Sequence, residues 1–195
     1  KDSIISDIIQ CNANGSLCIY IAKIYQSKDG QQHYAFGRIL SGTLKKEQKV
    51  KILGNTYNIN DEEDMIIDTI KNIYIYNSRY KIAINQAKAG NWILIEGISN
   101  HILKNATIID INSSNMNIFQ PLKFTCLPSM KIAVQPQIPN QLPQMIIALR
   151  QMNQIYPLMQ TKIEDSGEHI IIGSGELHLD SIMHDLRTIY DIEIM

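Results

Sequence analysis

The residues whose types and spacing suggest chemistry gather in one stretch near the carboxyl end of the chain. Ser166, Glu168 and His169 supply a hydroxyl, a carboxylate and an imidazole, the groups of a nucleophile, an orienting acid and a base. Adjacent residues of a strand point to opposite faces, so Glu168 and His169 cannot both turn toward Ser166 without outside help. The pattern therefore favours a turn and a strand edge over a catalytic triad.

Glu176, Asp180 and His184 recur at intervals of four, so a helix would carry all three side chains on one face. Oxygen and imidazole ligands in such a row could hold a metal ion. The row has no second histidine in register, and Arg187 lies close to it. We therefore expect a solvated helix face, with no metal and no catalytic residue in this chain.

The glycine corner Gly173-Ser174-Gly175 precedes this helix, and helix N-termini attract phosphate. The corner lacks the third glycine of the dinucleotide fingerprint and the Gly-Lys-Ser/Thr of the phosphate loop. Glu176 adds a carboxylate that favours the helix dipole and would repel a phosphate. We expect Ser174 to cap the helix and no cofactor to bind here.

A turn, a strand and a helix must position these residues. Asp165-Ser166-Gly167 is typical of a tight turn, and the run Ile170 to Ile172 predicts a strand covered on both faces. His178 lies beside the apolar stripe of the helix, so we expect it to pack or to contact a neighbouring domain. The stripe comprises Leu179, Ile182, Met183, Leu186, Ile189 and Tyr190.

Residues 116–195 as a whole predict an α+β domain. A strand at Met130 to Val134 precedes a helix that Asn140 can cap and that Tyr156-Pro157 ends. The helix stripe contains Leu142, Met145, Ile146, Leu149 and Met152. A strand through Met159, Thr161 and Ile163 follows, and Ile192 to Met195 is a truncated last strand. This order indicates a ferredoxin-like, split β-α-β plait: a four-stranded antiparallel sheet with helices on one face and the other face free for a partner domain.

Residues 15–115 predict a β barrel, because short strands alternate with glycine turns and closure removes exposed edges. Residues 1–14 read as a tether from an upstream domain. Asp29-Gly30 predicts a hairpin turn, and Gly37 predicts a bulge or a close backbone approach. The expected strands are Leu17 to Tyr25, His33 to Leu40, Lys49 to Leu53, Met65 to Ile75, Ile82 to Ala87, Trp92 to Glu96 and Ala106 to Ile111.

The composition excludes some functions. The 195 residues are 45% hydrophobic, enough for packed cores, and we expect neither a membrane-spanning run nor a secretory leader among them. The formal net charge is −1, so no basic excess drives autonomous binding to nucleic acid. Any contact with RNA must be local and shared with partner proteins.

Several motifs resemble one family, the translational GTPases of the elongation factor 2 and G group. Residues 164–180 read EDSGEHIIIGSGELHLD, similar to the ESGEH and G-x-GELHLE pattern of the third domain of these proteins. Residues 35–42 read AFGRILSG, which resembles a signature of their second, barrel domain. GNWILIEG at residues 90–97 and the acidic run at 61–64 resemble the U5 small nuclear ribonucleoprotein subgroup of the spliceosome more than elongation factor 2 itself.

The resemblance implies non-catalytic domains II and III, with GTP and Mg²⁺ expected only in a G domain outside this chain. It implies a nuclear protein whose partners are that G domain, large U5 proteins and U5 small nuclear RNA. The alternative is the same two domains of elongation factor 2, acting in ribosomal translocation. The family's third domain faces the switch regions, which makes an interdomain interface of Glu168, His169, Gly173, Gly175, Glu176 and His178.

Overall fold

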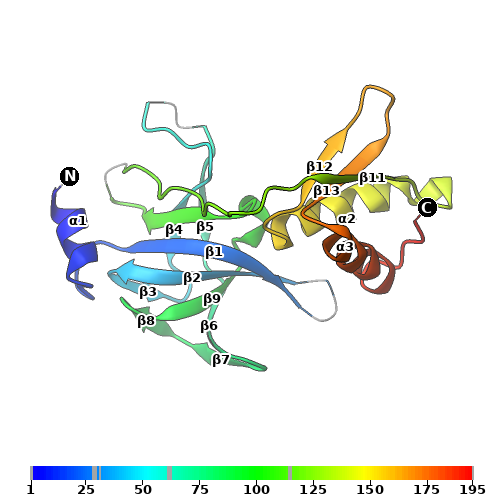
Figure 1. Ribbon diagram of the computed structural model, residues 1–195. Coiled ribbons are helices and arrows are strands. Elements are labelled where there is room, and N and C mark those ends of the chain that lie inside the picture. The colour runs from blue at the N-terminus through cyan, green and yellow to red at the C-terminus, as the bar shows by residue number, and fades with distance from the viewer. Residues whose placement is uncertain (1, 28–29, 31, 61–62, 114–115, 195) are drawn as a thin grey trace. The chain divides into compact units, whose positions relative to one another are not determined.

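The computed structural model describes residues 2–27, 30, 32–60, 63–113 and 116–194. Contacts separate two compact units, and the main division falls between Leu122 and Lys123. The expected turn residue Asp29 and the first half of the acidic run, residues 61–62, lie outside the described residues. Figure 1 shows the strands of the first unit and the mixed helices and strands of the second.

The first unit is built mainly of antiparallel strands. The strand order of its large sheet is β5-β4-β10-β1-β2-β9-β6-β7, and β3 pairs separately with β8. Within the described residues its elements are α1 (Asp2–Ile9), β1 (Cys18–Gln26), β2 (His33–Ser41), β3 (Thr43–Lys45), β4 (Lys49–Leu53), β5 (Met65–Thr69), β6 (Asn72–Asn77), β7 (Tyr80–Ile84), β8 (Gln86–Lys88), β9 (Trp92–Glu96), η1 (Ser99–His101) and β10 (Ala106–Asp110).

This sheet curls back on itself. The edge strand β5 ends at Thr69, and β6, which lies near the opposite edge, begins at Asn72. Three residue steps reach at most about 11 Å, so the two ends of the sheet must meet there. Ile70 stabilises this connection through two backbone hydrogen bonds. Its amide donates to the carbonyl of Gln48 at 3.0 Å, and its carbonyl accepts from the amide of Glu47 at 2.9 Å. The β domain is thus barrel-like. The chain segment that links β5 to β6 joins the two ends of the sheet, and β5 and β7 do not pair.

The join also corrects the expected strand Met65 to Ile75. Because Ile70 is fully buried and its backbone bonds to the segment before β4, the strand breaks into β5 and β6. The expected strand Ile82 to Ala87 is likewise divided between β7 and β8. Neither break contains the glycine or proline that ends other strands, so these turn signals alone do not reveal them.

The core of the first unit follows the period of two along its strands. In β9, Ile93 and Ile95 belong to the core cluster, whereas Trp92 remains 47% exposed on the outside. Burial of one isoleucine side chain contributes about 1.5–3 kcal/mol. The central members of the cluster are Ile19, Ile21, Ile24, Ile39, Val50, Ile52, Ile73 and Ile108.

At Gly37 the backbone of β1 comes close to β2. The register between these strands shifts between Ile21 and Lys23, beside the pair Ile21 and Gly37. A Cβ on Gly37 would collide with the carbonyl oxygen of Tyr20 and lie 2.6 Å from Cδ1 of Ile21. The predicted bulge and close approach are confirmed.

The segment before β1 is held against the end of the β domain. The amide of Gly42 donates to the carbonyl of Asn12 at 2.8 Å, and the Thr43 hydroxyl donates to the carbonyl of Ala13 at 2.8 Å. In α1, Ile5 and Ile9 stay 57% and 79% exposed. The assignment of residues 1–14 as a tether stays a prediction.

The second unit contains a sheet with strand order β11-β13-β12. Pro136 and Ile194 form an isolated antiparallel bridge, so the expected last strand is reduced to one bridge in the described residues. This order of elements matches the expected split β-α-β arrangement. They are β11 (Met130–Val134), η2 (Pro139–Gln141), α2 (Leu142–Ile155), β12 (Gln160–Ile163), β13 (His169–Gly173) and α3 (Glu176–Thr188).

Both helices pack on the same side of this sheet. Met145 and Met152 of α2, Leu179 and Ile182 of α3, and Ile171 of β13 belong to one buried cluster. Residues seven apart on α2 and three apart on α3 lie on one face of each helix, so they fill one layer between the helices and the sheet. Among the described residues, no helix combines the length and the apolar character needed to cross a membrane.

The opposite side of the sheet is only partly covered. Ile171 is buried, but its neighbours Ile170 and Ile172 are half-buried, so the expectation of a strand covered on both faces is wrong for this unit. The expected free face is present: Ile172 pairs with Lys131 of β11, and Ile170 pairs with Lys162 of β12. Because these pairs share the side away from the helices, that side exposes apolar and basic groups together.

Candidate functional site

The candidate site begins at the turn that joins β12 to β13. The amide of Gly167 donates to the carbonyl of Glu164 at 2.9 Å, and the amide of Glu164 donates to the carbonyl of Glu168 at 3.0 Å. Gly167 has a φ of 87°, which a residue with a side chain adopts only with strain. The predicted tight turn is confirmed. The exposed Ser166 hydroxyl donates to Oε2 of Glu168 at 3.3 Å.

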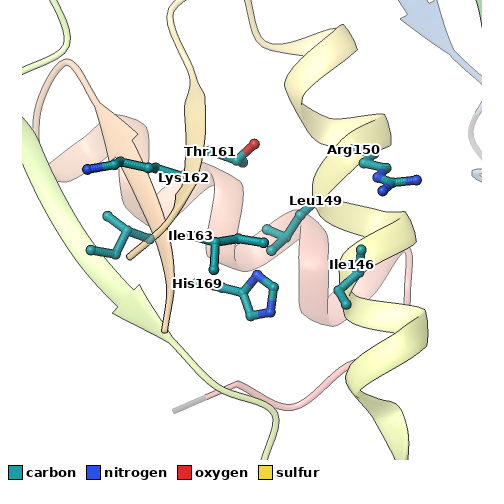
Figure 2. Close-up of a pocket in the computed structure, with 8 residues that line it drawn as sticks. Ile146, Leu149, Arg150, Thr161, Lys162, Ile163 and His169 are labelled. Carbon is teal, nitrogen blue, oxygen red and sulfur yellow. The ribbon is translucent and has the colours of Figure 1, made fainter. Parts of the chain in front are cut away.

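His169 leaves this turn on the helix side of the sheet. Figure 2 shows its ring in a shallow groove of about 200 Å³ between α2 and the strand pair β12–β13. Leu149 and Ile163 point into the same groove, and Arg150 stands at its rim. Ser166 therefore bonds to Glu168 while His169 faces the groove, and the grouping of hydroxyl, acid and base is not assembled.

The glycine corner follows at the other end of β13. Gly173 is buried, and a Cβ there would lie 2.8 Å from Cδ2 of Leu179 and 3.2 Å from Nδ1 of His178. Gly175 has an extended backbone with φ of 177°, and a Cβ there would meet nothing within 4 Å. Packing therefore requires glycine at Gly173, whereas neither backbone nor neighbours require it at Gly175.

The helix caps differ from the predicted ones. Gly175 is the N-cap of α3, and no side chain caps that helix, so the expected role of Ser174 is wrong. The Ser174 side chain instead lies 3.2 Å from Nδ1 of His178. Asn140 lies within η2, and Gln141 precedes α2 without a side-chain cap, so the cap expected at Asn140 is also wrong. Before α2 the short helix η2 takes the position that the cap needs, and before α3 the extended Gly175 takes it.

His178 is a packed residue at the base of the corner. The amide of Ser174 donates to its Nδ1 at 3.2 Å, so this nitrogen carries no proton and the proton lies on Nε2. Burial lowers the pKa of His178 below its ordinary value. The ring of Tyr156 lies 5.6 Å away, and the Tyr156 hydroxyl donates to Oδ2 of Asp185 at 2.7 Å. Burial, followed by this bond and the charge of Asp185, raises the pKa of Tyr156.

The first turn of α3 carries the exposed part of the corner. Glu176 is exposed at the positive end of the helix dipole, and Leu177 beside it is 84% exposed. The sequence analysis did not name Leu177 as a surface residue. Its position off the apolar stripe of α3 was the signal that could have predicted its exposure. Asp180 and His184 are also exposed, and no three His, Cys, Asp or Glu side chains gather as metal ligands within the described part of the chain.

The six predicted interface residues thus form two groups. Glu168 and His169 lie at the start of β13, and the other group lies at its far end, a distance of about 13 Å along a strand of five residues. The second group contains Gly173, Gly175, Glu176 and His178. Contact of either group with another domain stays a prediction. The geometry offers surface and packing rather than a reactive centre.

Two protein families match the chain, one for each unit. Residues 32–108 match the family described as elongation factor Tu domain 2. Residues 126–195 match the family described as elongation factor G, domain III. These ranges fall on the β domain and on the α+β domain that the structure separates, in the order expected from the motifs.

Curated proteins resemble the chain over most or all of its length. It is 42% identical to the 110 kDa U5 small nuclear ribonucleoprotein component CLO of Arabidopsis thaliana, with 100% of this chain and 20% of that protein covered. It is 43% identical to the 109 kDa component GFL of the same plant (97% and 20%) and 42% identical to the pre-mRNA-splicing factor cwf10 of Schizosaccharomyces pombe (91% and 18%). The chain spans about one fifth of the length of these relatives.

Proposed function

Because this chain belongs to the elongation-factor-like family that includes U5 small nuclear ribonucleoprotein components, we propose that it forms domains II and III of a spliceosomal GTPase. The observation that carries the proposal is the identity of 42–43% to splicing proteins across 91–100% of the chain. On this proposal the parent protein is nuclear and acts in pre-mRNA splicing. The chain is a non-catalytic part of it.

The proposed role is to relay the nucleotide state of a G domain to protein partners and to U5 small nuclear RNA. GTP and Mg²⁺ would bind in that G domain, since the 195 residues contain no Gly-x-x-x-x-Gly-Lys-Ser/Thr phosphate loop. A relay needs rigid domains with surfaces left open for neighbours. The buried cluster beneath α2 and α3 supplies the rigidity.

Three features of the second unit support an interface at the corner before α3. The space beside Gly175 is open, and neither its backbone conformation nor its neighbours require glycine there. A glycine at this position lets the backbone of another domain approach closely. Leu177 is 84% exposed, and Glu176 adds a charge beside it. Interfaces have an apolar core bordered by a polar rim, so Leu177 beside Glu176 suits the border between the two.

The assignment to splicing is tested with the tagged full-length parent protein, captured from nuclear and from cytoplasmic extract. We expect U5 small nuclear RNA and splicing proteins to accompany it from the nuclear extract. Ribosomal RNA and ribosomal proteins in their place would identify the parent as a translocase and overturn the assignment.

The relay surface is tested by reversing charge at both groups of the predicted interface. We expect Glu168→Lys with Glu176→Lys to weaken assembly or GTP-dependent activity of the full-length protein. Glu193→Lys, a single reversal at another exposed acid of the same unit, is the control for each single reversal and should have no effect. The interface is rejected if the double variant assembles and functions as the control does.

A further inference from the structure

The sheet of the second unit has an open edge at β12. The strand order β11-β13-β12 leaves one side of β12 without a neighbouring strand. The four residues of β12, Gln160–Ile163, are all exposed. An edge of this kind presents unpaired amides and carbonyls, which can pair with another chain. What the edge offers to a partner depends on which backbone groups point outward.

The register of β12 identifies those groups. The amide of Glu164 donates to the carbonyl of Glu168 at 3.0 Å, so these two residues form a hydrogen-bonded pair between the strands. Bonded and non-bonded pairs alternate in an antiparallel ladder, so Lys162 also bonds to β13. The amides and carbonyls of Thr161 and Ile163 therefore point away from β13. Within the described part of the chain, no other segment bonds to them.

The groove of about 200 Å³ between α2 and the strand pair β12–β13 lies beside this edge. Thr161 and Ile163 line it from the strand side, and Ile163 is 62% exposed. Leu149, which is buried, and Ile146, which is half-buried, line it from α2. Because side chains alternate between the faces of a sheet, a strand added to β12 would place every second side chain over the groove. Strand addition uses this combination of an open backbone edge and a side-chain pocket.

The charges around the groove favour an acidic partner. Figure 2 shows Arg150 at the same end of the groove as Thr161, and no acid of the described residues forms an ion pair with Arg150. Lys162 lies 3.5 Å from Glu164, but both side chains are partly exposed, and such a pair contributes little. The turn at residues 164–168 is itself acidic. The acids of a partner must therefore lie beside Arg150 and Lys162, away from the turn.

Two other occupants suit this edge less well. A second copy of the chain, paired edge to edge, would bring the Lys162 side chains of both copies close together, and like charges across a strand pair are destabilising. A nucleic acid would find no Phe, Tyr or Trp ring among the residues that line the groove. The short length of β12 and its lysine also discourage pairing with a strand that brings no complementary charge.

We propose that β12 binds an extended protein segment with the residue order apolar, acidic, acidic, which joins the sheet as an antiparallel strand. The apolar residue lies opposite Ile163 and enters the groove. The first acid lies opposite Lys162 on the other face, and the second lies opposite Thr161 on the side of Arg150. The inference uses the second unit alone and needs neither a G domain nor a splicing complex, so it goes beyond the proposed function.

The test uses the 195-residue chain and a fluorescein-labelled peptide, TVTLDETVT, followed by fluorescence anisotropy. The leucine, aspartate and glutamate at its centre have the proposed order, and we expect saturable binding with a Kd below about 1 mM. Methylation of the leucine amide removes a hydrogen bond to Ile163 and should weaken binding at least tenfold. Methylation of the aspartate amide is the matched control. That amide points away from β12, so affinity should change less than threefold.

Single variants of the chain test the groove and the charge. Ile163→Ala should weaken binding at least fivefold, whereas Ile147→Ala, at an isoleucine of α2 that is 56% exposed and does not line the groove, should change it less than twofold. Arg150→Glu should also weaken binding at least fivefold, and the peptide TVTLDKTVT should restore it. Arg187→Glu, at an exposed cation of α3, is the control for this charge reversal. Circular dichroism verifies that each variant is folded.

Three results would overturn the proposal. One is the absence of saturable binding of the unmethylated peptide, and another is equal weakening by the two methylated peptides. The third is self-association of the chain in sedimentation equilibrium that Ile163→Ala abolishes, because a second copy would then occupy the edge. None of these results depends on which complex the parent protein joins, so failure here is distinguishable from failure of the splicing assignment.

Discussion

The two glycines of the corner between β13 and α3 should respond in opposite ways to the same substitution. In Gly173→Ser, the new Cβ would lie 2.8 Å from Cδ2 and 3.0 Å from Cγ of Leu179. Leu179 is 4% exposed and packed in the core, so it cannot move away freely. Overpacking of this kind costs about 1–3 kcal/mol of unfolding free energy.

Gly175→Ser should be tolerated or slightly stabilising. A Cβ there meets nothing within 4 Å, and the φ of 177° suits any residue. Serine is a better N-cap than glycine by a few tenths of a kcal/mol, and it restricts the unfolded chain by about 0.4–1 kcal/mol. The expected change therefore lies between zero and a gain of about 1 kcal/mol.

The assay is urea unfolding followed with two probes. Far-UV circular dichroism at 222 nm follows mainly α2 and α3 of the second unit, whereas the fluorescence of Trp92 follows the first unit. With a slope of about 2 kcal/mol/M, a loss of 2 kcal/mol lowers the midpoint by about 1 M. Gly173→Ser should shift the dichroism transition and leave the fluorescence transition in place.

The reasoning fails if Gly173→Ser stays within about 0.5 kcal/mol of the parent, because the contact with Leu179 would then relax without cost. It also fails if Gly175→Ser loses more than about 1 kcal/mol. Once its stability is established, Gly175→Ser has a second use. A variant that folds normally and yet weakens assembly of the full-length protein would support a partner backbone close to this position.

Two further predictions concern Tyr156 and His178. Tyr156→Phe removes the 2.7 Å hydrogen bond to the Asp185 carboxylate and should cost about 1–2 kcal/mol in urea unfolding, whereas Tyr80→Phe at a residue 72% exposed should cost less than about 0.5 kcal/mol. Burial lowers the pKa of His178 in the folded chain. As the pH falls below about 6.5, the unfolded chain therefore binds a proton before the folded chain does, and the free energy of unfolding decreases. The stability that neutral His178 contributes is complete above that pH and is lost below it.

Both predictions have a defined contrary result. A dichroism transition of Tyr156→Phe within about 0.5 kcal/mol of the parent would mean that the bond to Asp185 contributes nothing net. For the histidine, the slope of unfolding free energy against pH between 5 and 6.5 should become shallower in His178→Gln, as measured by the dichroism transition. An unchanged slope would assign the pH dependence to other groups of the second unit.

Much of the architecture could be predicted from local signals. The strands Lys49–Leu53, Trp92–Glu96 and Met130–Val134 have the predicted bounds, because alternation ends at glycine, proline or polar turn residues on both sides. The predicted stripes are confirmed in part. Leu142 of the α2 stripe is 39% exposed, whereas six stripe residues are buried in the core: Met145, Leu149, Met152, Leu179, Ile182 and Leu186. Gly37 was predicted as a close approach because glycine weakens a strand interior and is typical of positions where another backbone comes near.

The errors share a physical origin. The strand Met65 to Ile75 was predicted as continuous because no glycine or proline interrupts it, whereas its break depends on bonds to Gln48 and Glu47, more than twenty residues away. Caps were placed on Ser174 and Asn140 from residue type alone, but α3 begins one residue later, after the extended Gly175, and Asn140 lies inside the short helix η2. The isoleucines of β13 led to the prediction that both of its faces are covered. Helices cover one face, and a second layer on the other face would be needed to bury Ile170 and Ile172 as well.

The sequence by itself determined the family, the order of the two domains and the residues that enter each core, because these depend on motifs and on apolar periodicity along the chain. The tertiary structure alone decided which residues share a surface. It separated the predicted interface into two groups at opposite ends of β13 and exposed Leu177 beside Gly175. It also brought Tyr25, Phe36, Tyr76 and Trp92 together from four strands, since strand order and register, rather than distance along the chain, decide which side chains meet.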